Sequence, residues 1–352
     1  MGNDSEAVSW YGTKRDLFKR LSMKVELILK DILELEHIPY LNVVSRAKDL
    51  ESYTQKAQKE KYDDPIQQIK DMAGIRVIAY VESDVEKISK KIEEEFQIDW
   101  KESVNKSSTM DLDRFGYRSN HYIAKLSELR CELPEFRAYK DLWFEIQIRT
   151  ILQHAWAEIE HDRNYKMKGI NLPNEKDIKR RFYLLAGALE SADREFNSIV
   201  DDVNQYAKKV SQDTQKGNIN IQINTISLEE FLLIKFSKEI KEGMINPNFG
   251  NVDVVISEIN DYGIKTLREL DDLIETSFQK GIISKILELA GTRSITGFLR
   301  LVMVINDSET YFTKSMKKNW GLTDEDKNLL EIFEINIQNL IEKYGIRELK
   351  SK

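Results

Sequence analysis

The segment 141–149 alternates between apolar and polar side chains, which is the pattern of a β-strand with two unlike faces. One face is apolar, and the other carries Trp143, Glu145, Gln147 and Arg149. A solvent-exposed sheet face alternates in the same way, so this strand alone does not indicate a site. A functional site is favoured by the rest of the sequence, because a second carboxylate and a second arginine accompany another predicted strand.

Asp71 stands at the opening of that strand, the β-branched segment 74–81, and Arg76 lies within it. Mg²⁺ prefers oxygen ligands and is commonly held by one or two carboxylates, while water and substrate phosphates complete its shell. If the two strands share a sheet, Asp71 and Glu145 suffice as magnesium ligands. Arg76 and Arg149 would then bind polyphosphate.

Further cations precede these strands, around the start of a helix predicted over 50–61. They are three basic residues and one hydroxyl: Arg46, Lys48, Ser52 and Lys56. The exposed N–H groups and the dipole of a helix N-terminus favour phosphate. A charged, solvated helix face is the alternative interpretation of this segment taken by itself.

An aromatic residue and a cation lie just before the strand predicted over 120–126, in the sequence Phe-Gly-Tyr-Arg-Ser-Asn-His (115–121). An exposed Tyr117 beside Arg118 is suited to stacking on a nucleobase. Gly-Tyr turns are common, however, so the motif carries weight only together with the others.

The helix predicted over 151–161 places His154, Glu158 and His161 on one face. This spacing lacks the HExxH arrangement of zinc enzymes. We therefore expect these side chains to order the site by hydrogen bonds, while Trp156 and Ile159 pack beneath the sheet.

Helices and strands alternate through the first half of the chain. Apolar residues three or four positions apart also predict helices over 14–36 and 84–96. Together with the three strands, they indicate an α/β or α+β domain with one mixed sheet. A long helix over 175–210 ends in the polar run 211–218, which we interpret as the domain boundary.

The remaining segment, 213–352, has mainly helical periodicity, including a last helix over 324–344, and no chemical motif. The whole chain carries 53 Lys and Arg against 60 Asp and Glu, a net charge of −7. This balance excludes a protein that coats nucleic acid through a strongly basic surface. The lone Cys131 excludes an intramolecular disulfide. Without a signal peptide or an apolar run of about 18 residues, we expect a cytoplasmic protein with no membrane partner.

Five motifs in order, over roughly residues 40 to 200, resemble the synthetase domain of the RelA/SpoT family. They are Arg46-x-Lys48 with Ser52-x-x-x-Lys56, Asp71 to Val77, Gly116-Tyr117-Arg118-Ser119-x-His121, Glu145 to Thr150, and Trp156-Ala157 followed by His161 and Tyr165-Lys166. The resemblance implies an α+β fold, with a nucleotidyltransferase-like mixed sheet flanked by helices in residues 1–212. A mainly helical domain would follow.

The resemblance also implies a pyrophosphokinase that moves the β,γ-pyrophosphate of ATP onto the 3′-hydroxyl of GDP or GTP, giving ppGpp or pppGpp, with Mg²⁺ as cofactor. Asp71 would hold the metal, and Glu145 would complete the metal site or take the hydroxyl proton. The ATP side would comprise Arg46, Lys48, Ser52, Lys56 and Arg76. The acceptor side would comprise Tyr117, Arg118, His121, Gln147 and Arg149.

The acceptor remains open, because the residues before the Gly-Tyr motif are Asp111 to Phe115 where many alarmone synthetases have a Pro-Lys pair. One alternative is a toxin-type or phage-defence relative that pyrophosphorylates the 3′ end of tRNA and is restrained by its C-terminal domain. Another is a non-catalytic nucleotide-binding regulator. Residues 213–352 could serve a homo-oligomer or bind a protein ligand, and hydrolysis of alarmones is not expected.

Overall fold

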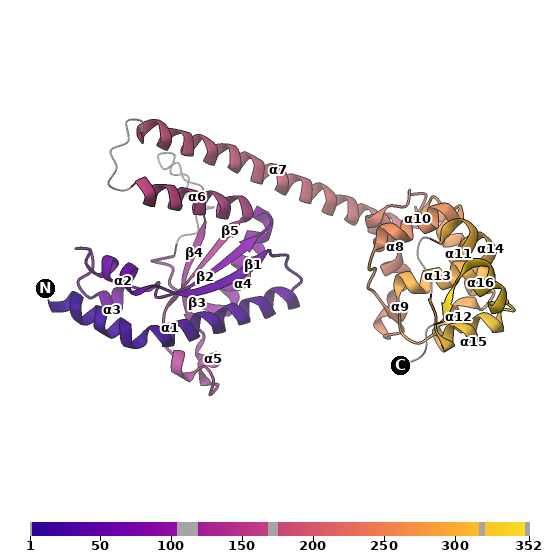
Figure 1. Ribbon diagram of the computed structural model, residues 1–352, viewed down its shortest axis with the longest axis horizontal. Coiled ribbons are helices and arrows are strands. Elements are labelled where there is room, and N and C mark those ends of the chain that lie inside the picture. Colours follow the sequence, from indigo (N-terminus) through magenta and orange to yellow (C-terminus); the bar gives the residue numbers. More distant parts are fainter. Residues whose placement is uncertain (1, 104–118, 168–174, 317–320, 349–352) are drawn as a thin grey trace. The chain divides into compact units, whose positions relative to one another are not determined.

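The computed structural model describes residues 2–103, 119–167, 175–316 and 321–348. The chain separates into two compact units, Met1–Val200 and Asp201–Lys352. The division falls within one helix, α7 (Glu175–Gln215), labelled in Figure 1. The division expected from sequence, between residues 212 and 213, falls within the same helix.

Helix α7 continues beyond the expected end at Val210, because the polar run 211–215 contains no helix-breaking residue. It ends where Gly217 adopts a left-handed conformation with φ +77°, which glycine accepts at little cost. The amide of Asn218 then donates to the carbonyl of Asp213 at 2.8 Å and closes the helix.

The first unit is built on one five-stranded mixed sheet, which confirms the fold expected from sequence. Its order is β1 (Asn42–Ala47), β2 (Ala73–Ala79), β5 (Phe144–Thr150), β4 (Asn120–Leu126) and β3 (Phe96–Ile98). The central strands β2 and β5 are parallel, and the other pairs are antiparallel.

Two helices cover the apolar face of this sheet, α1 (Gly2–Leu35) and α4 (Glu82–Glu95). Leu21, Val25 and Leu29 of α1 are almost fully buried against Val77 and Ile146 of the sheet. Complete burial of one such side chain contributes about 1.5–3 kcal/mol. The opposite face is therefore free to carry polar side chains.

Helix α6 (Ile151–Met167) and the first part of α7 run side by side in Figure 1, and the indole nitrogen of Trp156 donates to the carbonyl of Phe182. The expectation that Ile159 packs beneath the sheet is wrong, because its side chain is 56% exposed. Helix α7 is fixed to the sheet by a hydrogen bond of 2.6 Å from the Thr150 hydroxyl to the buried carboxylate of Asp193.

Other local expectations need correction. Arg46 lies on β1, which periodicity missed, rather than at a helix start, and Asp71 lies in the loop before β2. Strand β5 begins at Phe144, because Asp141 takes a positive φ of 62° and turns the chain. Four short helical elements complete the unit: α2 (Leu50–Ala57), α3 (Pro65–Gln68), α5 (Glu128–Glu132) and a 3₁₀ turn over Arg137–Tyr139.

The second unit is mainly helical, as expected. Its helices are α8 (Thr225–Lys235), α9 (Ser237–Lys241), α10 (Val252–Tyr262), α11 (Leu267–Gln279), α12 (Ile282–Leu289), α13 (Ile295–Asn306), α14 (Ser308–Thr310) with a π turn over Tyr311–Ser315, α15 (Asp324–Ile332) and α16 (Ile337–Tyr344). Two-residue strands pair as β6 (Ile245–Asn246) with β7 (Arg293–Ser294), and β8 (Gly321–Leu322) with β9 (Arg347–Glu348). Helix α13 is central to its core, with Phe298, Leu299 and Val302 buried.

The single helix expected over 324–344 is in fact α15 and α16. Glu334 takes a left-handed φ of 57°, and the Asn336 side chain accepts a hydrogen bond from the Asn339 amide to cap α16. An asparagine that bonds to the backbone in this way competes with a continuous helix. Within the described ranges, no helix is both long and apolar enough to cross a bilayer.

Candidate active site

The register of the sheet brings the polar side chains of four strands onto one face. Arg76 on β2 lies opposite Gln147 on β5, which lies opposite His121 on β4. In the next row, Gly74 lies between Arg46 on β1 and Glu145 on β5. The sequence therefore predicted the correct polar face of β5. The register of the sheet shows that β1 and β4 contribute Arg46 and His121 to the same face.

A cavity of about 170 Å³ opens over this face. Its polar lining consists of Ser45, Arg46, Lys48, Asp71, Arg76, Glu145 and Gln147. Gly74 also lines it, and a Cβ at that position would stand 3.9 Å from Arg46. The absence of a side chain at Gly74 thus leaves room between Arg46 and Glu145, its two neighbours in the row.

A second, wider cavity of about 440 Å³ adjoins the first. Its polar lining consists of Lys56, Lys61, Tyr62, Gln68, Lys70, Asp71, Glu102 and Glu145. The two cavities share Asp71 and Glu145. Lys61, Tyr62 and Lys70 were not predicted as site residues, because none of them belongs to the motifs that indicated the site.

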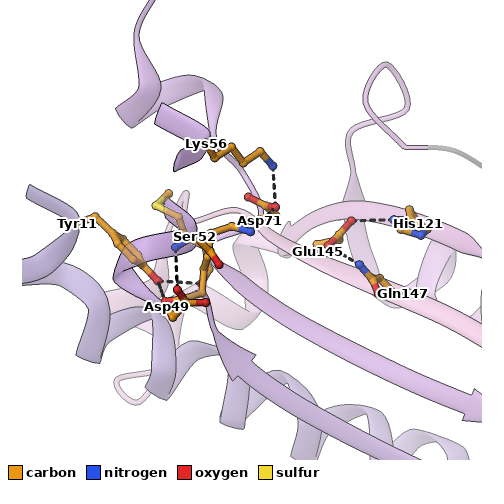
Figure 2. Close-up of polar contacts among 10 residues, drawn as sticks. Tyr11, Asp49, Ser52, Lys56, Asp71, His121, Glu145 and Gln147 are labelled. Atoms are coloured by element: carbon orange, nitrogen blue, oxygen red, sulfur yellow. Dashed lines mark hydrogen bonds and ion pairs between the residues drawn. The ribbon is translucent and has the colours of Figure 1, made fainter. Parts of the chain in front are cut away.

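Asp71 lies between two lysine side chains, drawn in part in Figure 2. Its Oδ2 is 2.9 Å from Nζ of Lys48 and 2.7 Å from Nζ of Lys56. Burial acts to raise the pKa of Asp71, but the two ammonium groups outweigh it and hold the pKa below its usual value. Oδ1 of Asp71 is buried and accepts no hydrogen bond from the described residues.

Glu145 is oriented by its neighbours on the same sheet face. It accepts hydrogen bonds of 2.8 Å from Nδ1 of His121 and from Nε2 of Gln147 (Figure 2). Nε2 of His121 in turn lies 2.6 Å from the Ser119 hydroxyl oxygen. Burial and the charge of Asp71 act to raise the pKa of Glu145, yet the bond and charge of His121 leave it lowered. Both carboxylates at the junction of the cavities are therefore ionised at neutral pH.

These two carboxylates are suited to Mg²⁺, which needs few protein ligands, and not to a metal ion that is coordinated by protein side chains alone. Among the described residues, no group of three or more His, Cys, Asp or Glu side chains is placed to hold a metal ion. Asp71 and Glu145 nevertheless line the same cavity, and the buried Oδ1 of Asp71 accepts no hydrogen bond from the part of the chain that the structure describes. Mg²⁺ keeps several positions for water and phosphate, so two carboxylates are enough.

Arginine side chains concentrate positive charge beside the first cavity. Burial lowers the pKa of Arg149, and the neighbouring Arg76 and Arg46 lower it further. Nη2 of Arg149 donates to Gln147 at 2.9 Å, while its buried Nε has no hydrogen-bond partner among the described residues. Arg76 is held by Glu158 of α6 at 2.6 Å. Glu158 and Glu145 offset part of this positive charge, and an anionic ligand would offset more of it.

Tyr11 of α1 lies beside Asp49 and Ser52 at the start of α2, as Figure 2 shows. Its hydroxyl donates to the carbonyl of Lys48 at 2.6 Å, and its ring stacks on Tyr53 at 4.3 Å between centroids. Burial raises the pKa of Tyr11 to about 12, so the hydroxyl keeps its proton. In the sequence, Tyr11 resembles any apolar position of α1, so its polar role was not predicted.

Among the other predicted residues, Ser52, His121 and Arg149 line neither cavity, and two more lie outside the described residues. Ser52 is exposed, and its amide donates to Asp49 at 2.7 Å as part of the α2 cap. Tyr117 and Arg118 lie outside the described residues. Lys56 lines the second cavity and Gln147 the first.

Comparison with known proteins identifies the region that bears this site. Residues 45–170 match the family model described as the region found in RelA/SpoT proteins. The chain contains a RelA/SpoT region. The motif resemblance is thereby confirmed, and all described residues of both cavities except Val44 lie within the RelA/SpoT region.

Individual relatives of the RelA/SpoT region are similar in sequence or in structure. GTP pyrophosphokinase YjbM of Bacillus subtilis is 28% identical over 189 residues, which are 53% of this chain and 83% of that protein. Small alarmone synthetase 1 from Bacillus subtilis is 25% identical with a TM-score of 0.46, covering 56% of this chain and 98% of its own. A GTP pyrophosphokinase family protein from Streptococcus pneumoniae is 24% identical with the same TM-score, covering 56% and 96%.

The lowered pKa of Asp71 in the RelA/SpoT region predicts how stability depends on pH. A carboxylate whose pKa is lower in the folded state stabilises the fold above its unfolded pKa of about 3.9, and this contribution is lost as the pH falls through the folded value. Asp71→Asn cannot titrate. Its melting temperature should therefore fall less than that of the wild type between pH 5 and pH 3, measured by circular dichroism. If the melting temperatures of the two proteins fell equally over this pH range, Asp71 would not have a lowered pKa in the folded state.

Proposed function

We propose that this protein is a pyrophosphokinase that transfers the β,γ-pyrophosphate of ATP to the 3′-hydroxyl of GDP or GTP. The observation that carries the proposal is the pair of adjoining cavities that share Asp71 and Glu145 and are lined by cations. A reaction between two nucleotides needs two binding places that meet at the reacting atoms. The match to the RelA/SpoT region and to a GTP pyrophosphokinase supports this assignment.

In this proposal the ATP triphosphate binds in the first cavity. Arg46, Lys48 and Arg76 line it and neutralise phosphate charge. Pyrophosphoryl transfer depends mainly on positioning and on stabilising charge rather than on a protein nucleophile. Lys48 lines the first cavity and also contacts Asp71, so it binds the phosphates next to the carboxylates that the two cavities share.

The acceptor nucleotide binds in the second cavity, which Lys56, Lys61, Lys70 and the aromatic ring of Tyr62 line. Its 3′-hydroxyl is directed toward Glu145, which lies at the junction. The roles of Tyr117 as a base-stacking residue and of Arg118 rest on their motif alone. His121 acts through Glu145, which it holds at 2.8 Å.

In the transfer step, the 3′-oxygen bonds to the β-phosphorus, the bond from that phosphorus to the α-phosphate oxygen breaks, and AMP leaves. Glu145 accepts the hydroxyl proton. Mg²⁺, held by Asp71 together with Glu145, would neutralise the charge on the phosphate oxygens. Arg149 lies on the same face of β5 as Glu145, two rows further along the sheet, and adds positive charge to that face.

The acceptor is tested by incubating the purified chain with Mg²⁺, ATP labelled at the γ-phosphate, and GDP, GTP or deacylated tRNA in separate reactions. We expect label in GDP or GTP. Label in tRNA alone would replace the proposed acceptor while keeping the pyrophosphokinase chemistry. No transfer to any of the three acceptors would contradict the proposed function.

Glu145→Gln tests the role of the shared carboxylate. Glutamine can still bond to His121 and Gln147 but takes no proton, so transfer should fall at least about 100-fold, the usual lower bound for a general base. Its melting temperature should stay close to that of the wild type. Glu128→Gln is the matched control, because Glu128 is exposed on α5 and lines neither cavity. A Glu145→Gln enzyme as active as this control would refute the assignment.

Tyr11→Phe tests the support behind the first cavity. Phenylalanine keeps the stack on Tyr53 but loses the hydrogen bond to Lys48, worth about 0.5–1.5 kcal/mol. The KM for ATP should therefore rise about 2- to 10-fold, while the KM for the acceptor stays unchanged. The Tyr40→Phe control removes a half-exposed hydroxyl that bonds to Glu34 instead. Equal changes in both KM values would show that Tyr11 stabilises the unit in general.

A further inference from the structure

The second cavity contains a carboxylate that the proposed reaction does not use. Three acidic side chains line this cavity, those of Asp71, Glu102 and Glu145. Asp71 and Glu145 serve the metal ion and the reacting hydroxyl in the proposed function, whereas Glu102 has no part in the transfer. A carboxylate repels phosphate groups and accepts hydrogen bonds. Its partner on a bound nucleotide is therefore a group that donates hydrogen bonds.

Glu102 is oriented by Lys70 through one of its two oxygens. Nζ of Lys70 lies 2.8 Å from Oε1 of Glu102 and 2.6 Å from Oδ2 of Asp99. The same ammonium group lies 4.9 Å from the centroid of the Trp143 ring. Oε2 of Glu102 makes no hydrogen bond or ion pair with the residues that the structure describes, and the side chain is 49% exposed. The carboxylate is thus held in place and can still accept hydrogen bonds from a ligand.

The turn that carries Glu102 is bound to the strand beside Glu145. The amide of Asp99 donates to the carbonyl of Ile123 at 2.8 Å, and the hydroxyl oxygen of Ser103 accepts from the amide of Ile123 at 2.9 Å. Ile123 lies directly opposite Glu145 in the sheet and also lines the second cavity. These bonds fix the position of Glu102 relative to the carboxylate that faces the acceptor hydroxyl.

We propose that Glu102 selects guanine as the base of the acceptor, by accepting hydrogen bonds from its N1–H and 2-amino groups. This inference rests on the proposed placement of the acceptor nucleotide in the second cavity. Guanine presents the two donors side by side on its Watson–Crick edge, and an ionised carboxylate has two acceptor oxygens. Adenine presents an acceptor, N1, at the position of the guanine N1–H. The contact therefore favours guanine over adenine.

The other polar groups that line the second cavity match this base edge less well. The side-chain oxygen of Gln68 already accepts a hydrogen bond of 3.1 Å from the amide of Asp64. Tyr62 offers a single hydroxyl oxygen, and the three lysines only donate, which suits phosphate. Among the described residues that line the second cavity, Glu102 is therefore the carboxylate that remains to bind the base.

Nucleotide binding to the full chain tests this contact without any transfer step. Isothermal titration calorimetry is carried out with Mg²⁺ and α,β-methylene ATP, whose carbon bridge between the α- and β-phosphorus atoms blocks pyrophosphate transfer. The titrants are GDP, inosine diphosphate (IDP), which lacks the 2-amino group, and xanthosine diphosphate (XDP), which carries a carbonyl oxygen there. The wild type should bind GDP at least about 10-fold more tightly than either analogue, because each analogue leaves the carboxylate without a donor.

Glu102→Gln should change this preference rather than only weaken binding. A glutamine amide can accept from N1–H and donate to the carbonyl oxygen of xanthine. The ratio of GDP affinity to XDP affinity should therefore fall at least about 10-fold through a gain in XDP affinity, which general damage to the fold cannot produce. Glu36→Gln is the matched control. Glu36 is also 49% exposed and pairs with Lys91 at 2.9 Å, but it lines neither cavity.

Three results would overturn the role of Glu102. They are equal affinities of the wild type for GDP and IDP, a wild type that does not bind GDP, and a Glu102→Gln protein with the same GDP-to-XDP ratio as the control. The labelled-ATP assay decides the proposed function separately. The expected binding pattern without transfer to any acceptor would refute the pyrophosphokinase and leave the selection of guanine in place.

Discussion

The site depends on two largely buried carboxylates that remain charged. Burying an isolated carboxylate costs several kcal/mol, so Asp71 and Glu145 require partners that favour their ionised forms. Two ammonium groups serve Asp71, while an imidazole and an amide serve Glu145. Because these partners come from β4, β5, α2 and the loop after β1, these elements must come together before the charges are stabilised.

The rest of the first unit holds these partners in place. Helix α1 covers the apolar face of the sheet and also supplies Tyr11, whose hydroxyl fixes the backbone of Lys48. Helix α6 supplies Glu158, which orients Arg76, and α7 supplies Asp193, which binds Thr150 next to Arg149. Helices α1, α6 and α7 line neither cavity, yet their contacts determine where the cations of the site lie.

The sequence predicted the features that follow a short period. Strand 120–126 has the predicted bounds, and the alternation in β5 placed Glu145, Gln147 and Arg149 on the polar face. Features fixed by tertiary contacts were missed. Lys70 reaches the second cavity from a loop, where Asp99 holds it at 2.6 Å, a contact across 29 residues that no local pattern reveals. The exposure of Ile159 likewise depends on where α6 lies against its neighbours.

The central claim is that the two cavities bring a β-phosphorus, not a γ-phosphorus, to the acceptor hydroxyl at Asp71 and Glu145. It is tested most directly by supplying ATP labelled at the β-phosphate and measuring AMP and labelled acceptor in the same reaction. The account predicts one AMP for each β-label transferred to the guanine nucleotide. Formation of labelled ADP, with no β-label in the acceptor, would show single phosphoryl transfer and contradict the account.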